Sequence, residues 1–483
     1  MKSTACQASD ETIDKRMRKT KIICTLGPAS DSDVVIGDLI LAGANIFRLN
    51  MSHARHDWVR DVVKRIRRIA AGLHANCGIL LDTQGPAIRT GDLSAKLNLK
   101  PGDIFEFTVR GAKSEEQFSV DVNYDGLVDD IHVGDTVLVD NGVIHMKVLE
   151  KNANRVKCQL LTEGDLGSRR HINLPGVKVN LPPLTAKDLE DIELGVEVGV
   201  DFVALSFCRE ASDILELKRV LRGLGSNART VAKIEDQNAV RYIKDIVRAA
   251  DSIMVARGDL GIECKMEELP IIQRRIIKEC IQFGRPVIVA THMLESMITN
   301  PIPTRAEITD VANAVFEQTD AVMLSGETAQ GKYPVECVKV LDRVARRIAL
   351  SGGAGYAEHA ILATQRQKTI RSAVMLANSI EDAKLVVFTR TGEMADQTSH
   401  LRPERAPIFV FTSTQEAVRH QTLNWNSHAF HLDFTTDAEE TFAEAEKILI
   451  QQKLVASGDK LIVLRELIEG EERFESIQIR TVP

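Results

Sequence analysis

The chain has 483 residues, of which 44% are apolar and 27% are charged, and its formal net charge is -7. This composition is typical of a globular protein large enough for two to four domains. The acidic balance argues against a nucleic-acid partner, and no uncharged apolar run reaches the length of a membrane span. We therefore expect neither nucleic acid nor a membrane as a partner.

The eight cysteines are scattered, and the closest two in sequence are Cys264 and Cys280. A disulfide framework or a zinc site would need tighter clustering. Scattered cysteines suit a reducing compartment, and the N-terminal segment 1–20 lacks the apolar core of a signal peptide. These features favour a cytoplasmic location.

Short β-rich apolar runs alternate with amphipathic helical stretches from residue 21 to residue 352, with one interruption. The predicted strands are Ile22–Leu26, Asn45–Leu49, Gly78–Asp82, Asp201–Ser206, Thr230–Ile234, Ser252–Ala256, Pro286–Ala290 and Asp320–Leu324. The predicted helices include Leu189–Val198, Ile214–Leu221, Val240–Ala249, Leu269–Phe283, Thr304–Phe316 and Pro334–Ile348. Alternation of this kind predicts parallel strands with right-handed crossovers. Eight units favour a closed (β/α)8 TIM barrel, formed by residues 21–91 and 181–352, over an open doubly wound sheet.

The interruption covers residues 92–180, between the third and fourth predicted strands. Its short alternating runs are Ile104–Val109, Thr136–Val139, His145–Leu149 and Arg155–Leu160. Turn dipeptides such as Pro101-Gly102 and Asn141-Gly142 separate these runs. This pattern predicts a small β-barrel domain inserted in a loop on the active-site side of the barrel, where it can act as a lid.

Predicted helices and strands alternate again in residues 353–483, with a different spacing from that of the barrel. The predicted elements are helix Thr369–Ile380, strand Lys384–Thr389, strand Pro407–Phe411, helix Gln415–Leu423, a weak strand near Phe430, helix Ala438–Val455, strand Lys460–Leu464 and a last strand Ser476–Thr481. We expect a separate C-terminal α/β domain of about five strands, with the last strand antiparallel.

Catalytic groups of a (β/α)8 barrel lie where the strands end. The residues that follow the predicted strands are Arg48, Asn50, Asp82, Lys233, Glu235, Asp259, Thr291, Ser325 and Glu327. Loops are generally polar, so one such residue indicates little. The complete set favours a functional site.

Two carboxylates, Glu235 and Asp259, follow successive strands and could hold a magnesium ion that keeps several waters. The alternative is ion pairing to Arg257 or Lys233. Lys233 precedes Glu235 by two residues, which places both side chains on one face of a strand. An ammonium beside a metal site suits a transferring phosphoryl group or a developing enolate.

Further charged and polar residues follow the first strands. Arg48 and Arg89 could bind anionic phosphates through two parallel hydrogen bonds. A second set offers neutral oxygens and one carboxylate, a mixture that suits potassium: Asn50, Ser52, Asp82 and Thr83. Asn and Ser in such positions also cap helices, which is the structural alternative.

At these residues the sequence resembles the pyruvate kinase family. The matching motifs are Thr25–Ser30, Arg48–His53, Leu81–Gly91, Val255–Glu263, Ala290–Met297, Pro303–Val315 and Asp320–Pro334. The resemblance implies a (β/α)8 barrel with an inserted β lid and a C-terminal α/β domain. It also implies a glycolytic activity that transfers the phosphoryl group of phosphoenolpyruvate to ADP, giving pyruvate and ATP.

The resemblance implies roles for individual residues. Glu235 and Asp259 would hold Mg2+ or Mn2+, Lys233 would stabilise the phosphoryl group, and Thr291 would help to protonate the enolate. The expected substrate contacts are Arg48, Arg89, Lys233, Gly258, Asp259, Thr291 and Ser325. The expected nucleotide contacts are His53 and Lys187. The resemblance further implies a homotetramer.

Two departures from the family pattern concern regulation and potassium. Gln84 and Ala87 stand where potassium-dependent members usually have Lys and Glu, but Thr83 resembles that branch, so we expect potassium dependence. In the C-terminal domain, Glu393 and Asp396 place negative charge in the turn where related enzymes bind a sugar-phosphate effector. Together with the glutamates of a final loop, Glu466–Glu475, this predicts weak or absent activation by fructose bisphosphate.

Two rival functions remain at this stage. A metal-dependent aldolase acting on pyruvate would share the carboxylate pair and an arginine. A catalytically silent regulatory homologue would be favoured if Lys233, Glu235, Asp259 or Thr291 were missing, but all four are present.

Overall fold

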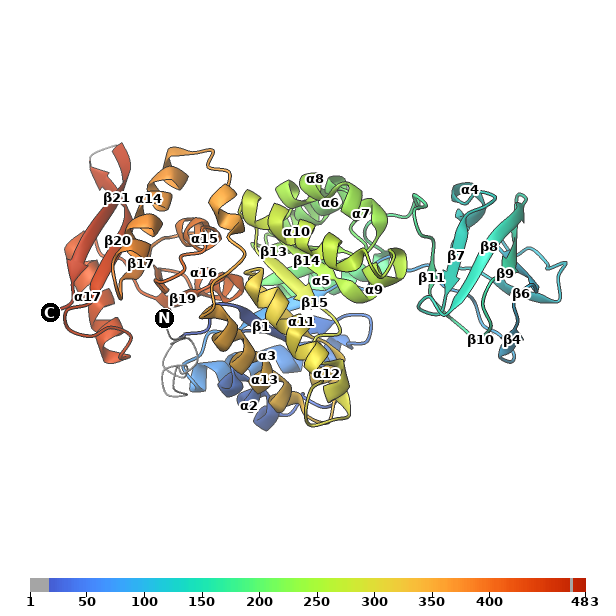
Figure 1. The fold of residues 1–483 in the computed structure, drawn as a ribbon, viewed down its shortest axis with the longest axis horizontal. Helices are drawn as coiled ribbons and strands as arrows, with labels where there is room; N and C mark the ends of the chain where they lie inside the picture. The colour runs from blue at the N-terminus through green and yellow to red at the C-terminus, as the bar shows by residue number, and fades with distance from the viewer. Residues whose placement is uncertain (1–16, 470–471) are drawn as a thin grey trace, which may run out of the picture.

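The computed structural model describes residues 17–469 and 472–483. Three bodies follow one another along the long axis of the molecule (Figure 1). The barrel lies in the middle, the inserted β domain at one end and the C-terminal domain at the other. Of the predicted N-terminal segment 1–20, residues 1–16 lie outside the described residues.

The central body is a closed barrel of eight parallel strands. They are β1 (Lys21–Thr25), β2 (Ile46–Asn50), β3 (Gly78–Asp82), β12 (Phe202–Leu205), β13 (Arg229–Ile234), β14 (Ser252–Ala256), β15 (Val287–Ala290) and β16 (Ala321–Leu324). Each strand pairs in parallel with its neighbours, and β1 pairs with β16 to close the ring. The predicted barrel is confirmed, and the open sheet is wrong.

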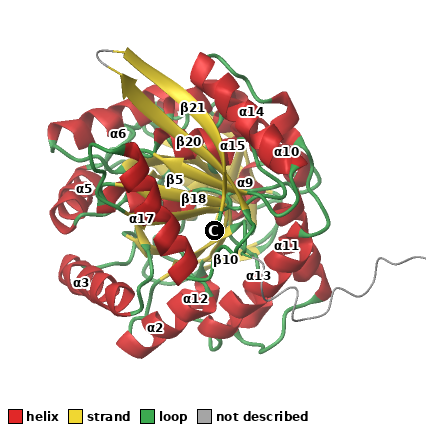
Figure 2. Ribbon diagram, turned by 90° about the vertical axis from the view of Figure 1, so that its left-hand side faces the viewer, coloured by secondary structure: helices red, strands yellow, loops and turns green. Residues whose placement is uncertain are grey.

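Helices surround these strands when the molecule is viewed from the side of the C-terminal domain (Figure 2). They are α2 (Asp33–Ala42), α3 (His56–Gly72), α5 (Ala186–Val198), α6 (Ala211–Gly223), α7 (Gln237–Arg241), α8 (Ile243–Ala249), α9 (Arg257–Glu263), α10 (Leu269–Phe283), η1 (Glu295–Ile298), α11 (Arg305–Phe316), α12 (Gly326–Ala329) and α13 (Pro334–Ala349). The predicted single helix Val240–Ala249 is wrong in one respect. Tyr242, at φ -97° and ψ 17°, leaves helical geometry and separates α7 from α8.

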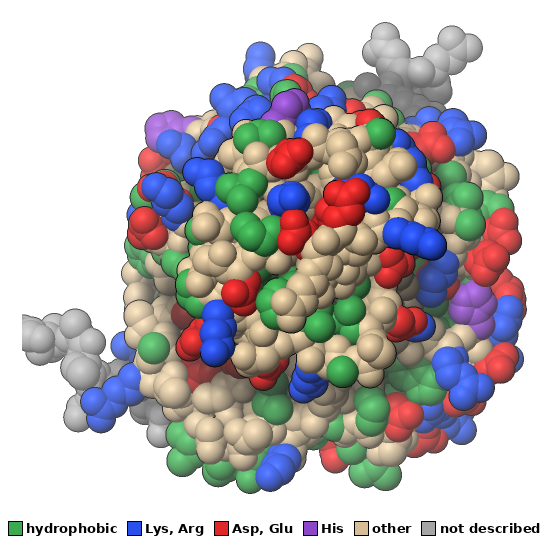
Figure 3. All heavy atoms as spheres, turned by 90° about the vertical axis from the view of Figure 1, so that its right-hand side faces the viewer, with side chains coloured by type: hydrophobic (Ala, Val, Ile, Leu, Met, Phe, Trp, Pro, Cys, Tyr) green, Lys and Arg blue, Asp and Glu red, His purple; other side chains and the backbone are tan. Residues whose placement is uncertain are grey.

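The insert forms its own β domain between β3 and α5. Its elements are β4 (Leu97–Leu99), β5 (Ile104–Thr108), β6 (Phe118–Asp121), α4 (Leu127–Asp130), β7 (Thr136–Val139), β8 (Ile144–Lys151), β9 (Arg155–Leu160), β10 (Gly164–Leu166) and β11 (Ile172–Asn173). A six-stranded sheet has the order β11-β7-β8-β9-β5-β6, and β10 pairs with β4. Seen from this end, acidic and basic side chains are interspersed over the surface (Figure 3).

The C-terminal domain is a five-stranded sheet of order β19-β18-β17-β20-β21 with helices. Its elements are η2 (Tyr356–His359), α14 (Gln365–Ser379), β17 (Lys384–Phe388), α15 (Glu393–His400), β18 (Ile408–Thr412), α16 (Gln415–His420), η3 (Gln421–Leu423), β19 (Ser427–His431), α17 (Ala438–Gln451), β20 (Lys460–Glu469) and β21 (Glu472–Thr481). The last strand is antiparallel, as expected. The expected final loop Glu466–Glu475 is wrong, because β20 and β21 continue as a paired hairpin through most of it.

The C-terminal domain closes the N-terminal end of the barrel with an apolar plug. Leu423, in the short helix η3, is 2% exposed and belongs to the hydrophobic cluster inside the barrel. The ring of His420 lies 5.8 Å from the ring of Phe202, at the start of β12. A Cβ atom on Gly78, at the start of β3, would lie 2.5 Å from the Thr422 hydroxyl. The fit therefore requires glycine at position 78.

Buried ion pairs surround this plug. Asp201 precedes β12, accepts a hydrogen bond from Ile79 N at 2.8 Å and pairs with Arg419 of α16 at 2.6 Å. Asp320 precedes β16 and pairs with Arg402 at 2.6 Å, with both side chains almost fully buried. Each aspartate thus satisfies a barrel backbone group and a C-terminal-domain cation, which joins the two bodies.

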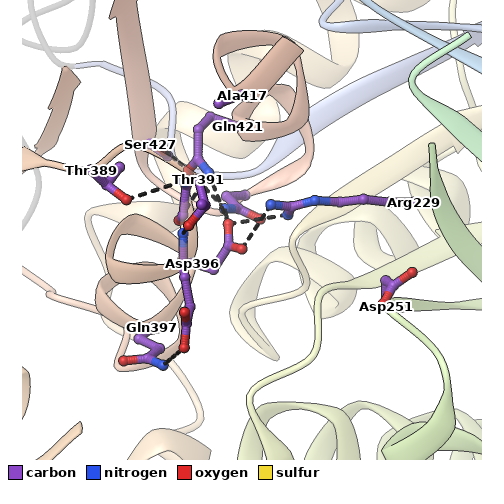
Figure 4. A network of polar contacts seen from close by, with 12 residues as sticks. Arg229, Asp251, Thr389, Thr391, Asp396, Gln397, Ala417, Gln421 and Ser427 are labelled. Atoms are coloured by element: carbon purple, nitrogen blue, oxygen red, sulfur yellow. Dashed lines mark hydrogen bonds and ion pairs between the residues drawn. The ribbon is translucent and has the colours of Figure 1, made fainter. Parts of the chain in front are cut away.

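Asp396 joins the same interface from the first turn of α15 (Figure 4). Its carboxylate lies 2.8 Å from Arg229 at the start of β13 and accepts hydrogen bonds from Gln421 and Asn424. Burial alone would raise the pKa of Asp396, but Arg229 holds it below its usual value. The expectation that Asp396 directs free negative charge at an effector is wrong, because Arg229 neutralises it. Glu393 is exposed and lies 3.6 Å from Arg366, so its charge is partly offset as well, and the weak activation stays a prediction.

Among the described residues, no helix combines the length and the apolar character needed to span a bilayer.

Replacing the plug residue tests whether the C-terminal domain supports the barrel. We expect Leu423→Ala to lower the free energy of unfolding by about 2–5 kcal/mol, because it leaves a cavity in a packed interior. Chemical denaturation measures this change. Leu215→Ala on α6, where the side chain is 53% exposed, is the matched control and should change stability by less than about 0.5 kcal/mol. Equal stabilities for the two variants would contradict the plug.

Buried histidines at this interface predict an acid-sensitive fold. Burial lowers the pKa of His420 to about 4 and that of His400 to about 3, whereas an unfolded histidine titrates near 6.5. The unfolded chain therefore binds more protons as the pH falls from about 6.5 to about 4, and stability falls by roughly 1.4 kcal/mol per pH unit for each histidine. Denaturation of His420→Gln across this window should give a shallower slope. An unchanged slope would contradict the assignment.

Candidate active site

The ammonium of Lys233 is the centre of the site at the C-terminal rim of the barrel. It lies at the end of β13, is 9% exposed and donates a hydrogen bond to the Ser206 hydroxyl at 2.7 Å. Its Nζ also lies 3.0 Å from Glu235 Oε1 and 3.2 Å from Asp82 Oδ1. Three neighbouring strands, β3, β12 and β13, therefore meet at one cation.

The charges of this group explain its protonation. Burial alone would lower the pKa of Lys233, but Asp82 and Glu235 raise it above its usual value. Burial alone would raise the pKa of Asp82, but Lys233 and Arg48 hold it down. Burial, opposed by Lys233 and reinforced by Asp259, raises the pKa of Glu235 to about 7. Lys233 and Asp82 are thus held in their charged forms, whereas burial disfavours the charged form of Glu235.

Arg48 completes the cationic side of the site. It lies in β2, is 9% exposed, and its Nε donates to Asp82 Oδ2 at 2.6 Å. Its second nitrogen, Nη1, donates to the Thr25 hydroxyl at 3.1 Å. Asp82 therefore holds Arg48 and Lys233 on opposite oxygens, which presents two positive groups on one side of the rim.

Glu235 and Asp259 lie at the ends of adjacent strands, as predicted. Glu235 Oε2 accepts a hydrogen bond at 2.6 Å from the backbone N–H of Phe207, whose φ of 54° is unusual for a bulky residue. Asp259 lies in the first turn of α9. The alternative partner Arg257 pairs instead with Asp310 at 2.7 Å. Arg257 therefore pairs with neither carboxylate, whereas the other alternative partner, Lys233, does pair with Glu235 at 3.0 Å.

Within the described residues, no group of three or more His, Cys, Asp or Glu side chains is arranged to hold a metal ion. Two carboxylates with substrate and water oxygens are enough for magnesium. Burial disfavours the ionised form of Glu235, and a divalent cation bound beside it would stabilise that form.

Thr291 is strained and anchored beside α9. Its φ of 71° is rare for a β-branched residue. Its hydroxyl accepts a hydrogen bond from Gly258 N at 2.7 Å and donates to Ala290 O at 2.6 Å. Arg257 Nη2 donates to the Thr291 carbonyl at 2.6 Å. These contacts fix Thr291 against the start of α9.

Ser325 follows β16 and precedes α12. Its backbone N–H donates to Glu327 Oε2 at 2.7 Å, and Glu327 is fully buried. The Ser325 hydroxyl is buried without a hydrogen-bond partner. An unpaired buried hydroxyl at the rim is compatible with a ligand contact.

The residues expected at a potassium site lie together at the ends of β2 and β3. Asn50 pairs in register with Asp82, and its side-chain oxygen accepts a hydrogen bond from Ser52 N at 3.2 Å. The Thr83 hydroxyl donates to Ala204 O at 3.0 Å. Asp82 is already paired with Arg48 and Lys233, so a potassium ion would share its carboxylate with these two cations.

The expected nucleotide residues lie beside this group, in and against the loop that follows β2, and Arg89 lies apart. Lys187 on α5 donates to Met51 O at 2.8 Å and pairs with Asp191 at 2.6 Å, next to the loop that carries the exposed His53. Arg89 is exposed and its Nη1 donates to Arg169 O at 3.2 Å. It therefore contacts the inserted domain, away from the Arg48 and Lys233 pair.

Three contacts that organise the site were not predicted from the sequence. Ser206 bonds Lys233, the Phe207 N–H bonds Glu235, and Arg257 braces Thr291. Ser206 had a usable signal, since it is a polar residue directly after β12. The backbone conformation of Phe207 and the partner of Arg257 are not visible in sequence.

Known proteins resemble this chain over most of its length. Family models described as pyruvate kinase, barrel domain, and pyruvate kinase, alpha/beta domain, match residues 17–338 and 367–479. Plastidial pyruvate kinase 2 of Arabidopsis thaliana is 41% identical over 96% of this chain and 81% of its own length. A pyruvate kinase of Geobacillus stearothermophilus is 39% identical over 94% of this chain and 78% of its own length.

A solved structure extends the comparison to the whole fold. A pyruvate kinase from Cryptosporidium parvum superimposes with a TM-score of 0.92 at 32% identity, covering 98% of each chain. Similarity of this extent in both sequence and fold covers the barrel, the inserted domain and the C-terminal domain. The chain therefore belongs to the pyruvate kinase family.

Proposed function

We propose that the rim site transfers the phosphoryl group of phosphoenolpyruvate to ADP, giving pyruvate and ATP. The observation that carries this proposal is the position of Lys233, which lies between Asp82 and Glu235 at 3.2 and 3.0 Å. A fixed ammonium beside a carboxylate pair offsets the charge of a transferring phosphoryl group.

Phosphate binding would use the cationic side of the rim. Arg48 and Lys233 share Asp82, so both are oriented before substrate arrives and little ordering is needed on binding. Arg89 contacts the inserted domain and would reach the phosphate only when that domain moves. The Gly258 region at the start of α9, with Asp259 and Ser325, would hold the substrate carboxylate.

The family uses divalent metal and potassium, and this chain offers residues for both. Glu235 and Asp259 would hold Mg2+ or Mn2+, which neutralises charge on the phosphoryl and enolate oxygens when it is bound. Asn50, Ser52, Asp82 and Thr83 would hold K+. Lys233 remains a fixed cation whether or not these ions are present.

The reaction has two steps. An ADP oxygen attacks phosphorus in line, and the bond from phosphorus to the enol oxygen breaks, which leaves an enolate stabilised by Lys233. The enolate then takes a proton at its methylene carbon. The Thr291 hydroxyl donates to Ala290 O, so its own proton is engaged. We therefore propose that Thr291 orients a water that delivers the proton.

Nucleotide would enter from the side of His53 and Lys187. Lys187 pairs with Asp191 on its own helix, and an incoming phosphate would share that ammonium. The aldolase alternative uses the same carboxylates but no nucleotide. The silent homologue is disfavoured because Lys233, Glu235, Asp259 and Thr291 are all at the rim.

Domain limits, assembly and location are proposals at a coarser level. We assign residues 21–91 with 181–352 to the barrel, 92–180 to the lid and 353–483 to the C-terminal domain. A homotetramer and a cytoplasmic location are proposed from the resemblance. Every cysteine that the structure describes is free, which supports a reducing compartment.

Removing the central ammonium tests the chemistry. We expect Lys233→Met to lower kcat by roughly 100- to 1,000-fold, because a fixed cation at the developing charge is lost. Pyruvate formation measures this loss. Lys244→Met is the control, since Lys244 lies on α8 with its side chain 60% exposed. Near-normal turnover of well-folded Lys233→Met would contradict the role.

Turnover with and without potassium tests the monovalent site. We expect pyruvate formation from phosphoenolpyruvate, ADP and magnesium to rise sharply when K+ replaces a bulky organic cation, because the oxygens near Asp82 suit K+. Equal rates in both buffers would contradict the potassium site and leave the reaction unchanged. Absence of turnover in either buffer would contradict the proposed function.

A further inference from the structure

The segment that returns from the lid to the barrel, residues 172–181, lies on three successive βα loops. Arg209, after β12, donates to Val179 O at 2.8 Å. Asn238, after β13, donates to Val177 O at 3.3 Å. Both contacts bind lid backbone, so they do not depend on which lid side chains are present.

The third loop makes a different contact. Asn173 Nδ2, at the end of β11, donates to Glu263 Oε1, at the end of α9, at 2.9 Å. Asn173 is 6% exposed and Glu263 is 8% exposed. Among the described residues, this is the one hydrogen bond between a side chain of lid residues 92–180 and a side chain of barrel residues 181–352. The other hydrogen bonds that the structure describes between these two parts join barrel side chains to backbone carbonyls.

Apart from this hydrogen bond, the two side chains have few polar partners in the part of the chain that the structure describes. Asn173 Oδ1 is buried without a hydrogen-bond partner, and no ion pair of Glu263 occurs within the described part of the chain. Gln237 Nε2 holds the Glu263 carbonyl at 2.5 Å. A Cβ atom on Gly142, in a second lid loop, would lie 3.2 Å from Ile262. The lid thus contacts the last turn of α9 at two adjacent residues.

Helix α9 connects this contact to the reaction. It spans Arg257–Glu263, so its first turn carries Gly258 and Asp259, and its last turn carries the lid contact. Gly258 N is bonded to Thr291 at 2.7 Å. A seven-residue helix is about 10 Å long. A lid held at the last turn of α9 therefore keeps a fixed position relative to Gly258 and Asp259 in its first turn.

We propose that Asn173 and Glu263 are positioning residues whose hydrogen bond holds the returning segment of the lid on α9, as the fixed support from which the rest of the lid closes over substrate. The proposal rests on the proposed roles of Gly258 and Asp259 in the reaction. The pair touches neither phosphoenolpyruvate nor metal and acts through α9.

Exchange of the two side chains tests the pair. Asn173→Ala should lower kcat/KM for phosphoenolpyruvate by roughly tenfold, because a buried hydrogen bond is lost and the carboxyl is left unpaired. Asn173→Asp should lower it further, because two carboxyl groups then face each other. The double variant Asn173→Asp with Glu263→Gln exchanges amide and carboxyl and should return kcat/KM to within about threefold of the unaltered protein.

A matched control is available inside the lid. Asn98 donates to Asp165 at 2.8 Å at an exposed position within the lid, so Asn98→Ala removes a bond of the same chemical type away from α9 and should leave kcat/KM unchanged. Failure of the double variant to recover activity, or an equal loss in Asn98→Ala, would overturn the proposal.

Amide hydrogen exchange separates this proposal from the proposed reaction. Residues 172–181 should exchange faster in Asn173→Ala than in the unaltered protein, and unchanged exchange would overturn the lid contact. If the unaltered protein shows no turnover, the reaction is overturned, and the exchange measurement alone then decides whether Asn173 and Glu263 seat the lid.

Discussion

Closure of the eight-stranded barrel is the constraint on which the site depends. A closed ring of parallel strands brings all carboxyl ends to one rim, so residues distant in sequence meet there. Lys233 contacts groups from three neighbouring strands. Burial of that ammonium is tolerable only because Asp82 and Glu235 compensate it. Positioning of the cation and stability of the rim therefore arise from the same contacts.

The two ends of the barrel are used differently. At the N-terminal end, Leu423 fills the interior while Asp201 and Asp320 bind cations of the C-terminal domain. These contacts are paired and buried, which suits a structural role. At the opposite end, burial raises the pKa of Glu235 to about 7, and the Ser325 hydroxyl lacks a hydrogen-bond partner. Polar groups with a shifted pKa or without a partner lie at the C-terminal rim, and fully paired polar groups lie at the N-terminal end. This difference matches a catalytic role for the rim and a stabilising role for the N-terminal end.

The lid is held to the barrel by a short series of contacts that follow the order of the strands. Arg209 and Asn238 bind lid backbone, and Glu263 binds a lid side chain. All three residues lie in the segments that directly follow β12, β13 and β14. The segment after β14 also carries the proposed substrate contacts Gly258 and Asp259, so it positions both the lid and the substrate. A lid attached in this way can move as a body while α9 keeps its register.

The sequence by itself determined the order of strands and helices, the closed barrel and the candidate residues at its rim, because period and turn chemistry are local properties. Strand Gly78–Asp82 and helix Leu269–Phe283 agree with the structure at both ends. Only the tertiary structure decided which rim residues meet. Ser206 beside Lys233, Asp396 turned toward Arg229, Arg89 bound to the lid and Leu423 inside the barrel each depend on contacts between distant segments. Such contacts depend on how strands and domains that are distant in sequence pack together, and a local sequence pattern does not contain this information.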